Sequence, residues 1–316
     1  MKIAVLDDYS NVARTITDWS AVDAIGTVTV FNDPFDGEEA AAKALESFDV
    51  IVGMRERTPF PASLIKRLPN LKLLITTGMR NLAFDLDAAK AQGITVSGTV
   101  SVGYAAAEQT WALILGLAKR IAIEDADMRK GGWQSGLPVD LNGRRLGVIG
   151  LGKLGAQVAG VGKLFGMDVV AWSQNLTEER CAEVGVQKVS FEELLETSDF
   201  ATIHLILSDR SRGLIGEREI SRMKKSAYLI NTSRGPIVDE AALISALQNN
   251  TIAGAAVDVY DVEPLPVDHT FRKLPNALLA PHLGYVTREN YATMYTQAVE
   301  NILAYTIGEP RRVLNG

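Results

Sequence analysis

The feature that most constrains the fold is an alternation, along the whole chain, between short β-branched apolar runs and amphipathic stretches. This pattern is typical of α/β folds with parallel sheets, because each buried strand is followed by a helix that covers one face of the sheet. The strand-like runs form two series: residues 2–7, 28–32, 49–54, 71–76 and 94–98, then residues 144–150, 167–172, 200–207, 226–233 and 252–259. We therefore predict two doubly wound parallel-sheet domains.

The stretch between the two series indicates a domain boundary. A long apolar helix is predicted over residues 105–123, followed by a Gly-Gly-Trp segment with Pro138. The chain ends in another helical stretch, residues 287–307, which could pack back on the first series and make that domain discontinuous. We predict one domain from residues 1–100 and 287–316 and a second from residues 101–286.

Composition narrows the class of protein. The chain has 316 residues, 47% hydrophobic and 22% charged, which is enough for about two soluble domains. A net charge of −6 without a basic stripe makes nucleic acid an improbable partner, and neither a signal peptide nor a membrane span is expected. The single Cys181 leaves no internal disulfide, which favours the cytoplasm, and it is a poor candidate nucleophile. We predict no metal site.

A glycine-rich turn opens the second series. Gly150, Gly152 and Gly155 have the GxGxxG spacing, directly after a strand and at the start of a helix. The first glycine permits the tight turn, the second lets the backbone approach a pyrophosphate, and the third lets helix and strand pack closely. The helix N-terminus also favours an anion. We predict dinucleotide binding by Gly150, Gly152, Lys153, Leu154 and Gly155, and the alternative is a loop whose glycines serve packing alone.

The next strand ends without the acid that usually binds both ribose hydroxyls of a dinucleotide. Trp172, Ser173, Gln174 and Asn175 stand there instead. An acid at position 173 would repel a 2′-phosphate, whereas Ser173, Gln174 and Asn175 can donate hydrogen bonds to one. Arg180 in the next helix is a further candidate donor. We therefore favour NADP(H) as the cofactor, with NAD(H) as the alternative because no Arg or Lys follows Ser173 directly.

Three further segments carry a family resemblance. NTSRGPIVDE, DVYDVEP and APHLGY closely resemble those of the D-isomer-specific 2-hydroxyacid dehydrogenases, and the match runs over nearly the whole chain. The resemblance implies a Rossmann nucleotide domain in the middle of the chain, a flavodoxin-like substrate domain made from both termini, a cleft between them, and a homodimer joined mainly through the nucleotide domains. It also implies that Arg234 binds the substrate carboxylate and keto oxygen, that Glu263 orients the histidine, and that His282 is the acid/base.

Physical chemistry leads to the same three roles. Reduction of a ketone by hydride needs a proton for the developing alkoxide, and histidine is the side chain best suited to supply it near neutral pH. A carboxylate hydrogen-bonded to the ring stabilises the imidazolium, and an arginine offers a planar fork that matches a carboxylate. Asp261 is the nearest competitor for the role of Glu263. We predict that His204 is a structural residue or lies beside the cofactor, and that His269 is solvated.

The resemblance assigns further binding residues. Thr232, Asp258 and Gly284 are expected at the cofactor, although Asp258 has a helix or turn cap as its alternative. In LLITTGMRN, Gly78 and Met79 correspond to a loop whose backbone N–H groups bind the substrate carboxylate.

Two arginines in VGMRERTPFP complete the expected substrate site. Arg55 and Arg57 resemble a two-arginine turn that faces the far end of the substrate in phosphoglycerate dehydrogenases. The alternative is a pair of surface arginines beside Glu56, which we slightly favour.

We predict an oxidoreductase that transfers a hydride between a nicotinamide cofactor and a small D-2-hydroxy acid or 2-keto acid, such as glyoxylate or hydroxypyruvate. One alternative is a short phosphoglycerate dehydrogenase. Another is an NAD(H)-sensing, corepressor-like binding protein of the same fold. Such proteins retain much of the same set, so Arg234, Glu263 and His282 argue against an inactive enzyme and leave a second role open.

Overall fold

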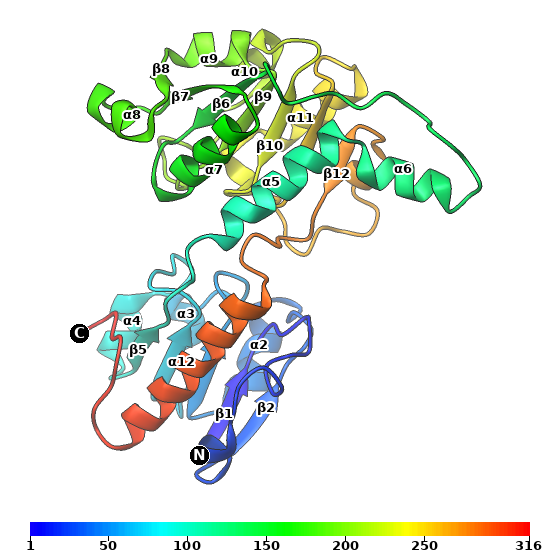
Figure 1. Ribbon diagram of the computed structural model, residues 1–316. Coiled ribbons are helices and arrows are strands. Elements are labelled where there is room, and N and C mark those ends of the chain that lie inside the picture. Colours follow the sequence, from blue (N-terminus) through cyan, green and yellow to red (C-terminus); the bar gives the residue numbers. More distant parts are fainter. The chain divides into compact units, whose positions relative to one another are not determined.

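The computed structural model describes residues 1–316, and the chain divides into two compact units (Figure 1). Unit 1 comprises Met1–Val102 and Val286–Gly316, and unit 2 comprises Gly103–Tyr285. Unit 1 therefore contains both ends of the chain, whereas unit 2 is continuous in sequence.

Unit 1 is built on a five-stranded parallel sheet with the order β2-β1-β3-β4-β5. Its strands are β1 (Lys2–Val5), β2 (Thr27–Val30), β3 (Val50–Gly53), β4 (Leu73–Thr76) and β5 (Thr95–Gly98). In the register, Ile3 lies opposite Val28 on one side and Val50 on the other. This is the strand order of flavodoxin-like folds. Both β3 and β4 are buried at every residue, and apart from Thr76 at the end of β4 neither contains a polar side chain.

Helices cover both faces of this sheet. They are α1 (Ser20–Asp23), α2 (Gly37–Leu45), α3 (Ala62–Ile65), α4 (Leu86–Ala91) and α12 (Arg288–Thr306). On one face, Leu45 of α2 and Leu64 of α3 pack in a core with Ile51 and Leu74 of the strands. The helices α1 and α12 contact each other, and α12 also contacts β4.

Unit 2 is built on a seven-stranded parallel sheet with the order β12-β11-β10-β9-β6-β7-β8. Its strands are β6 (Arg145–Ile149), β7 (Asp168–Trp172), β8 (Gln187–Lys188), β9 (Phe200–Ile203), β10 (Tyr228–Asn231), β11 (Gly254–Val257) and β12 (Ala277–Leu279). The strand order reverses between β6 and β9. In open α/β sheets, ligands bind at the carboxyl ends of the strands at such a reversal.

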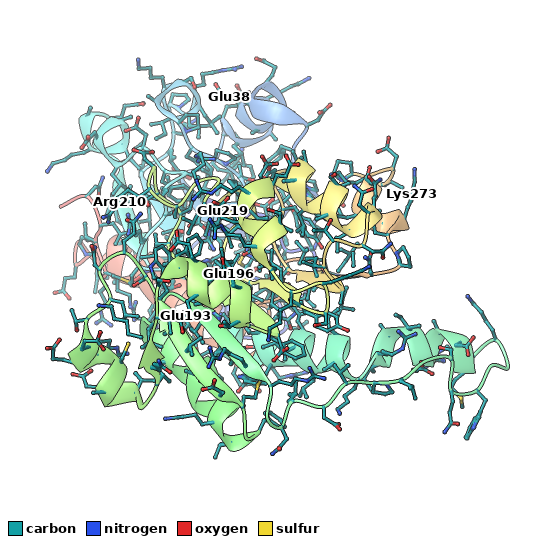
Figure 2. All side chains as sticks on the ribbon, turned by 90° about the horizontal axis from the view of Figure 1, so that it is seen from above. Glu38, Glu193, Glu196, Arg210, Glu219 and Lys273 are labelled. Carbon is teal, nitrogen blue, oxygen red and sulfur yellow. The ribbon has the colours of Figure 1, made fainter.

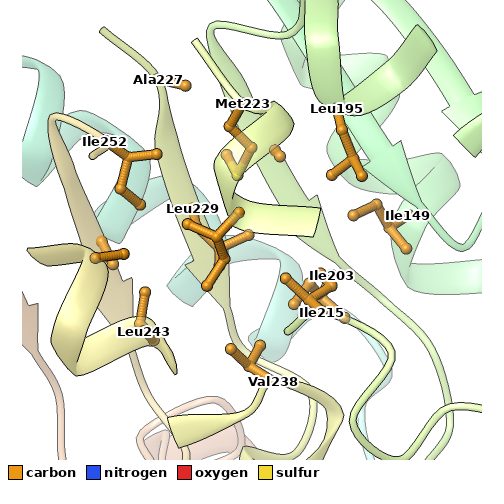
Figure 3. Close-up of a cluster of buried hydrophobic side chains, with 14 of the residues drawn as sticks. Ile149, Leu195, Ile203, Ile215, Met223, Ala227, Leu229, Val238, Leu243 and Ile252 are labelled. Carbon is orange, nitrogen blue, oxygen red and sulfur yellow. The ribbon is translucent and has the colours of Figure 1, made fainter. Parts of the chain in front are cut away.

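Two hydrophobic cores lie on opposite faces of this sheet. One is formed with α5 (Ala105–Ala118), α7 (Lys153–Leu164) and α8 (Glu178–Val184), and the other with α9 (Phe191–Thr197), α10 (Glu217–Arg222) and α11 (Glu240–Gln248). Figure 3 shows part of the second core, where Leu229 of β10 lies among apolar side chains that include Ile203, Met223 and Leu243. Both units are thus doubly wound parallel-sheet units, which confirms the predicted fold class.

The helix expected over residues 105–123 is wrong in its extent, because it is two helices. Arg120 has a left-handed φ of 56° and separates α5 from α6 (Ile121–Met128). The side chains of Trp111 and Ile114 hold α5 against the sheet, whereas α6 buries no residue. Because α6 has no buried side chains, no tertiary packing stabilises a continuation of α5 along the same axis.

None of the helices has the combination of length and apolar composition that a membrane span needs.

Candidate active site

The glycine turn joins β6 to α7 at the reversal of the strand order. Gly150 has a φ of +105°, and a Cβ on it would lie 2.6 Å from the carbonyl oxygen of His204. A Cβ on Gly155 would lie 2.0 Å from the carbonyl oxygen of Gly150, so α7 packs directly on the turn. Gly152, in contrast, faces open space. The turn therefore leaves its backbone open to a phosphate group at the N-terminus of α7.

A cavity of about 530 Å³ lies beside this turn. Its walls come from residues 150–152, from residues 172–180 after β7 and in α8, and from residues 204–214 after β9. Among the residues predicted to bind the cofactor, those that line the cavity are Gly150, Gly152, Ser173, Gln174 and Asn175. The predicted residues that lie outside its lining are Lys153, Leu154, Gly155, Thr232, Asp258 and Gly284. The cavity thus sits where the carboxyl ends of β6, β7 and β9 meet, and its polar rim fits the adenosine end of a dinucleotide.

No carboxylate lines this cavity, and two arginines do, Arg180 and Arg210. The Arg180 side chain donates from Nε to the carbonyl oxygen of Leu151 at 3.1 Å and pairs through Nη1 with Glu183 at 2.9 Å. Arg180 was predicted from the sequence, and Arg210 was not. Only its position could have indicated Arg210: it is a basic residue in the polar segment that follows a predicted strand of the second series.

His204 also lines the cavity. Its Nε2 lies 3.0 Å from the hydroxyl oxygen of Thr202, and burial lowers the pKa of His204 to about 4. A histidine with this pKa is neutral at physiological pH and does not serve as the proton donor of a reduction.

Arg234, Glu263 and His282 lie just beyond three neighbouring strands. Arg234 follows β10, Glu263 follows β11 and His282 follows β12, and these strands are adjacent and parallel. Because parallel strands present their carboxyl ends at one edge of the sheet, the three residues share that edge.

Glu263 and His282 are directly bonded. Oε2 of Glu263 lies 2.5 Å from Nδ1 of His282, while Oε1 accepts the backbone N–H of Tyr260 at 2.9 Å. Burial alone would raise the pKa of Glu263, but the hydrogen bond and charge of His282, the Tyr260 N–H and the charge of Arg234 together lower it. The carboxylate is therefore ionised near neutral pH, and it leaves Nε2 of the ring for a substrate. The role of Tyr260 was not predicted from the sequence: the residue lies in DVYDVEP, but it contributes its backbone N–H, which the residue type does not indicate.

The loop that carries Arg234 is held by its own polar groups. Asn231 donates from Nδ2 to the carbonyl oxygen of Arg234 at 3.0 Å, and Ser233 donates from Oγ to the carbonyl oxygen of Ile203 at 2.7 Å. The guanidinium of Arg234 donates from Nη1 to the Ser233 carbonyl oxygen at 2.8 Å. The backbone that presents the guanidinium is thus tied to the neighbouring strand β9.

Asp258 holds the segment that follows His282. Its Oδ1 accepts the backbone N–H of Leu283 at 2.7 Å, and its Oδ2 accepts that of Gly284 at 2.8 Å. The side chain is buried, and burial raises the pKa of Asp258, with neighbouring groups acting in both directions. The observed contacts are therefore those of a cap on the turn after His282, which itself has a left-handed φ of 54°.

The other candidate acid and histidine belong to a separate network. Nε2 of His269 lies 3.0 Å from Oε1 of Glu240, and the second oxygen of Glu240 lies 3.5 Å from the backbone nitrogen of Asp261. Burial raises the pKa of Asp261, and the charges of Glu240 and Asp239 add to that effect. In the structure, Glu263 and not Asp261 is the partner of His282.

In unit 1, the predicted substrate loop lies just beyond β4. Gly78 has a φ of +147°, and a Cβ on it would lie 2.4 Å from Nη1 of Arg55. Met79 is 48% exposed. The Arg55 side chain donates from Nη1 to the carbonyl oxygen of Thr77 at 3.2 Å, so its guanidinium lies against the loop that the sequence assigns to the substrate carboxylate.

Arg57 is held differently. Its Nη1 donates to the carbonyl oxygen of Asp7 at 2.9 Å, and its guanidinium carbon lies 4.2 Å from the centre of the Tyr9 ring. The structure therefore separates the two arginines that the sequence analysis treated as one pair: Arg55 lies at the loop, whereas Arg57 stabilises the segment after β1.

Comparison with known proteins identifies the family. The family model of the D-isomer specific 2-hydroxyacid dehydrogenase NAD binding domain matches residues 111–284. The chain is 38% identical over 291 residues to a glyoxylate reductase from Aeropyrum pernix, covering 88% of this chain and 86% of that protein. It is 35% identical over 277 residues to a D-3-phosphoglycerate dehydrogenase from Bacillus subtilis, covering 85% of this chain and about half (52%) of that longer protein.

A solved structure agrees over the full length. The crystal structure of a phosphoglycerate oxidoreductase from Vibrio cholerae has a TM-score of 0.92 and 37% identity to this chain, covering 98% of this chain and 99% of that one. The glycine turn, the bonded Glu263–His282 pair and these matches lead to one conclusion: the chain belongs to the family of D-isomer-specific 2-hydroxyacid dehydrogenases.

Proposed function

We propose that the protein reduces small 2-keto acids, with glyoxylate and hydroxypyruvate as the leading substrates and NADP(H) as the favoured cofactor. The observation that carries this proposal is the pair in which the Glu263 carboxylate is bonded to Nδ1 of His282. It provides a positioned imidazole whose protonated form is neutralised by a carboxylate, which is the arrangement that a general acid needs.

In the proposed reaction, His282 donates a proton from Nε2 to the carbonyl oxygen as the alcohol forms. Glu263 holds the ring through Nδ1 and stabilises its charge. Arg234 binds the substrate carboxylate and polarises the keto group. When bound, a reduced nicotinamide supplies the hydride. Hydride and proton together convert the ketone to the 2-hydroxy acid.

We assign cofactor binding to the unit of residues 101–286 and substrate binding to that of residues 1–100 and 287–316. The backbone N–H groups of Gly78 and Met79 are proposed to bind the substrate carboxylate, with Arg55 beside them. The names of relatives, glyoxylate reductase and D-3-phosphoglycerate dehydrogenase, support a small acid as substrate and leave a phosphorylated 2-hydroxy acid as the second candidate. We also keep Thr232, Asp258 and Gly284 as cofactor residues of this proposal.

His282→Ala tests the catalytic assignment. We expect the Kd for NADPH to stay within about twofold, whereas kcat falls by about two to four orders of magnitude, the range for losing a positioned general acid. The experiment measures NADPH binding by fluorescence titration and turnover on glyoxylate and hydroxypyruvate separately. A variant that keeps near-normal kcat on the best substrate would remove His282 from this role.

The preference for NADP(H) rests on the end of β7 and on the cavity beside it. Ser173 stands where an acid would repel a 2′-phosphate, and no carboxylate lines the cavity. We expect a higher kcat/KM with NADPH than with NADH, and we expect Ser173→Asp to reverse that order mainly through the KM for NADPH. A preference of the wild-type chain for NADH of about tenfold or more, about 1.4 kcal/mol, would contradict the assignment.

We further propose a homodimer formed through unit 2. Large apolar side chains are exposed on α6 and on the segment after it, among them Trp133 at 74% and Leu137 at 93%. Such a patch on one element is typical of a protein interface. We expect light scattering to show a dimer that Trp133→Glu with Leu137→Glu dissociates. Ile25→Glu, at an exposed apolar residue of unit 1, is the control that leaves the dimer intact.

A further inference from the structure

The segment after β9 presents a second basic residue to the cavity beside the glycine turn. Ser208, Arg210 and Ser211 line the cavity from this segment, while Ser173 lines it from the end of β7. Arg210, which is labelled in Figure 2, is exposed. It forms no hydrogen bond or ion pair in the structure. Its guanidinium, with five N–H donors, is therefore available to a ligand.

The backbone that carries Arg210 is nevertheless fixed. Ser211 is buried, and its hydroxyl donates to the carbonyl oxygen of Ile206 at 2.7 Å and accepts the backbone N–H of Ser208 at 2.8 Å. The backbone N–H of Arg212 donates to the Ser208 carbonyl oxygen at 2.9 Å. A turn tied at both ends thus presents one unpaired guanidinium at the rim of the cavity.

The side chain of Arg180, in contrast to that of Arg210, already has hydrogen-bond and ion-pair partners. Its Nε donates to the Leu151 carbonyl oxygen at 3.1 Å, its Nη2 lies 3.5 Å from the Gly152 carbonyl oxygen, and its Nη1 is paired with Glu183 at 2.9 Å. The charge of Arg180 is thus already balanced, and its donors hold the carbonyl groups of the glycine turn. Arg180 therefore acts as a brace for the turn more than as a free cation.

We propose that Arg210 is the residue that binds the 2′-phosphate of NADP(H) in the cavity that Ser173 also lines. This inference rests on the proposed preference for NADP(H) and names the residue that produces it. A guanidinium binds phosphate oxygens in charge-assisted, often bidentate hydrogen bonds, and no carboxylate in the cavity lining competes for it. The proposal also explains why the residues directly after Ser173 need no Arg or Lys: the cation comes from the segment that follows β9.

The experiment measures binding, so that it does not depend on turnover. The full-length chain is titrated calorimetrically with NADPH, NADH, 2′,5′-ADP and 5′-ADP, in the wild type, in Arg210→Gln and in Arg212→Gln. The last variant is the matched control, because it removes the same charge two residues away on a side chain outside the cavity lining. The cofactor fragments 2′,5′-ADP and 5′-ADP measure binding of the adenosine end of the cofactor alone.

We expect Arg210→Gln to raise the Kd for NADPH and for 2′,5′-ADP by about tenfold or more, as expected for the loss of a hydrogen bond to a charged group. The Kd values for NADH and 5′-ADP should change by less than about twofold, and Arg212→Gln should leave all four within that limit. Added salt should weaken 2′,5′-ADP binding to the wild type more than to Arg210→Gln.

Two outcomes would contradict the proposals, and they differ. If the wild type binds NADPH more tightly than NADH and Arg210→Gln keeps the same ratio, Arg210 is not the phosphate ligand, and the proposed cofactor preference stands. If the wild type binds NADH as tightly as NADPH, the proposed cofactor preference itself is wrong.

Discussion

Glu263 accepts from His282 with one carboxylate oxygen and from the backbone N–H of Tyr260 with the other, so the acid that orients the imidazole is itself fixed at both oxygens. The carboxylate has no freedom to turn away from the ring without losing a second hydrogen bond. Its lowered pKa keeps it charged when the ring takes up a proton.

Glu263→Gln tests this coupling. The amide keeps the shape of the side chain but removes the negative charge, which disfavours the protonated ring. We expect kcat for reduction to fall roughly 10- to 100-fold, which is part of the full effect of a general acid. We also expect the pH at which the rate is half-maximal to move to lower pH. The measurement is kcat as a function of pH between about pH 5 and 9. Glu240→Gln is the matched control, since Glu240 pairs with His269. An unshifted pH profile would show that the carboxylate only positions the ring.

Arg234→Lys should not restore activity. An ammonium group cannot make the two parallel hydrogen bonds of a guanidinium, and the loop around Arg234 is too well bonded to shift toward a shorter donor. We expect kcat/KM on the best keto acid to fall by about two orders of magnitude, the usual cost of a misplaced binding group. Retention of near-normal kcat/KM would mean that Arg234 contributes charge alone.

Arg55 and Arg57 should give different phenotypes. We expect Arg55→Ala to raise the KM for keto acids that carry a terminal phosphate or second carboxylate much more than the KM for glyoxylate. The backbone N–H groups of Gly78 and Met79 are proposed to bind the carboxylate that all these substrates share, which leaves the Arg55 guanidinium beside them for the second anionic group. Arg57→Ala should instead lower the melting temperature, since it removes the hydrogen bond to Asp7 and the contact with the Tyr9 ring. Equal losses on all substrates in Arg55→Ala, with unchanged binding of the cofactor, would return Arg55 to a structural role.

The low pKa of His204 predicts how stability depends on pH. In the unfolded chain the histidine takes up a proton near pH 6.5, whereas in the folded chain burial lowers its pKa to about 4. Between these values the unfolded state holds more protons, so the free energy of unfolding falls as the pH falls through this window, by at most about 1.4 kcal/mol per pH unit. His204→Gln should have a flatter profile there and a parallel one above about pH 7.5. Urea unfolding of both proteins at several pH values measures the difference, and parallel curves throughout would contradict the buried, neutral state.

The sequence predicted those parts of the fold that depend on long apolar runs. The ten strands predicted from such runs all correspond to strands of the two sheets, because burial on both faces leaves a clear pattern. The strands β8 and β12 were missed, since β8 has only Gln187 and Lys188 and β12 is three half-buried residues. The break at Arg120 was missed because a left-handed φ at a residue other than glycine has no sequence signature.

The residues of the candidate site could be predicted from the sequence, but the hydrogen bonds between them could not. The spacing of glycines gave the turn, and the family resemblance gave Arg234, Glu263 and His282. That Asp258 caps the backbone of Leu283 and Gly284 could not be read from the sequence, because the contact joins residues 25 and 26 positions apart through the register of β11 and β12. The partners of Arg180 and the isolation of Arg210 likewise depend on how loops from different strands meet.

The return of the last helix to the first domain sets an order for folding during synthesis. Residues 1–102 leave the ribosome first, yet the side chains that α12 buries in unit 1, among them Met294, Tyr295 and Ile302, are made last. Unit 2 is continuous and has all of its strands once Tyr285 has been translated. Unit 2 therefore needs no later segment for its sheet, whereas unit 1 keeps the apolar side chains that α12 covers exposed until that helix docks, and exposed apolar surface of this kind favours aggregation.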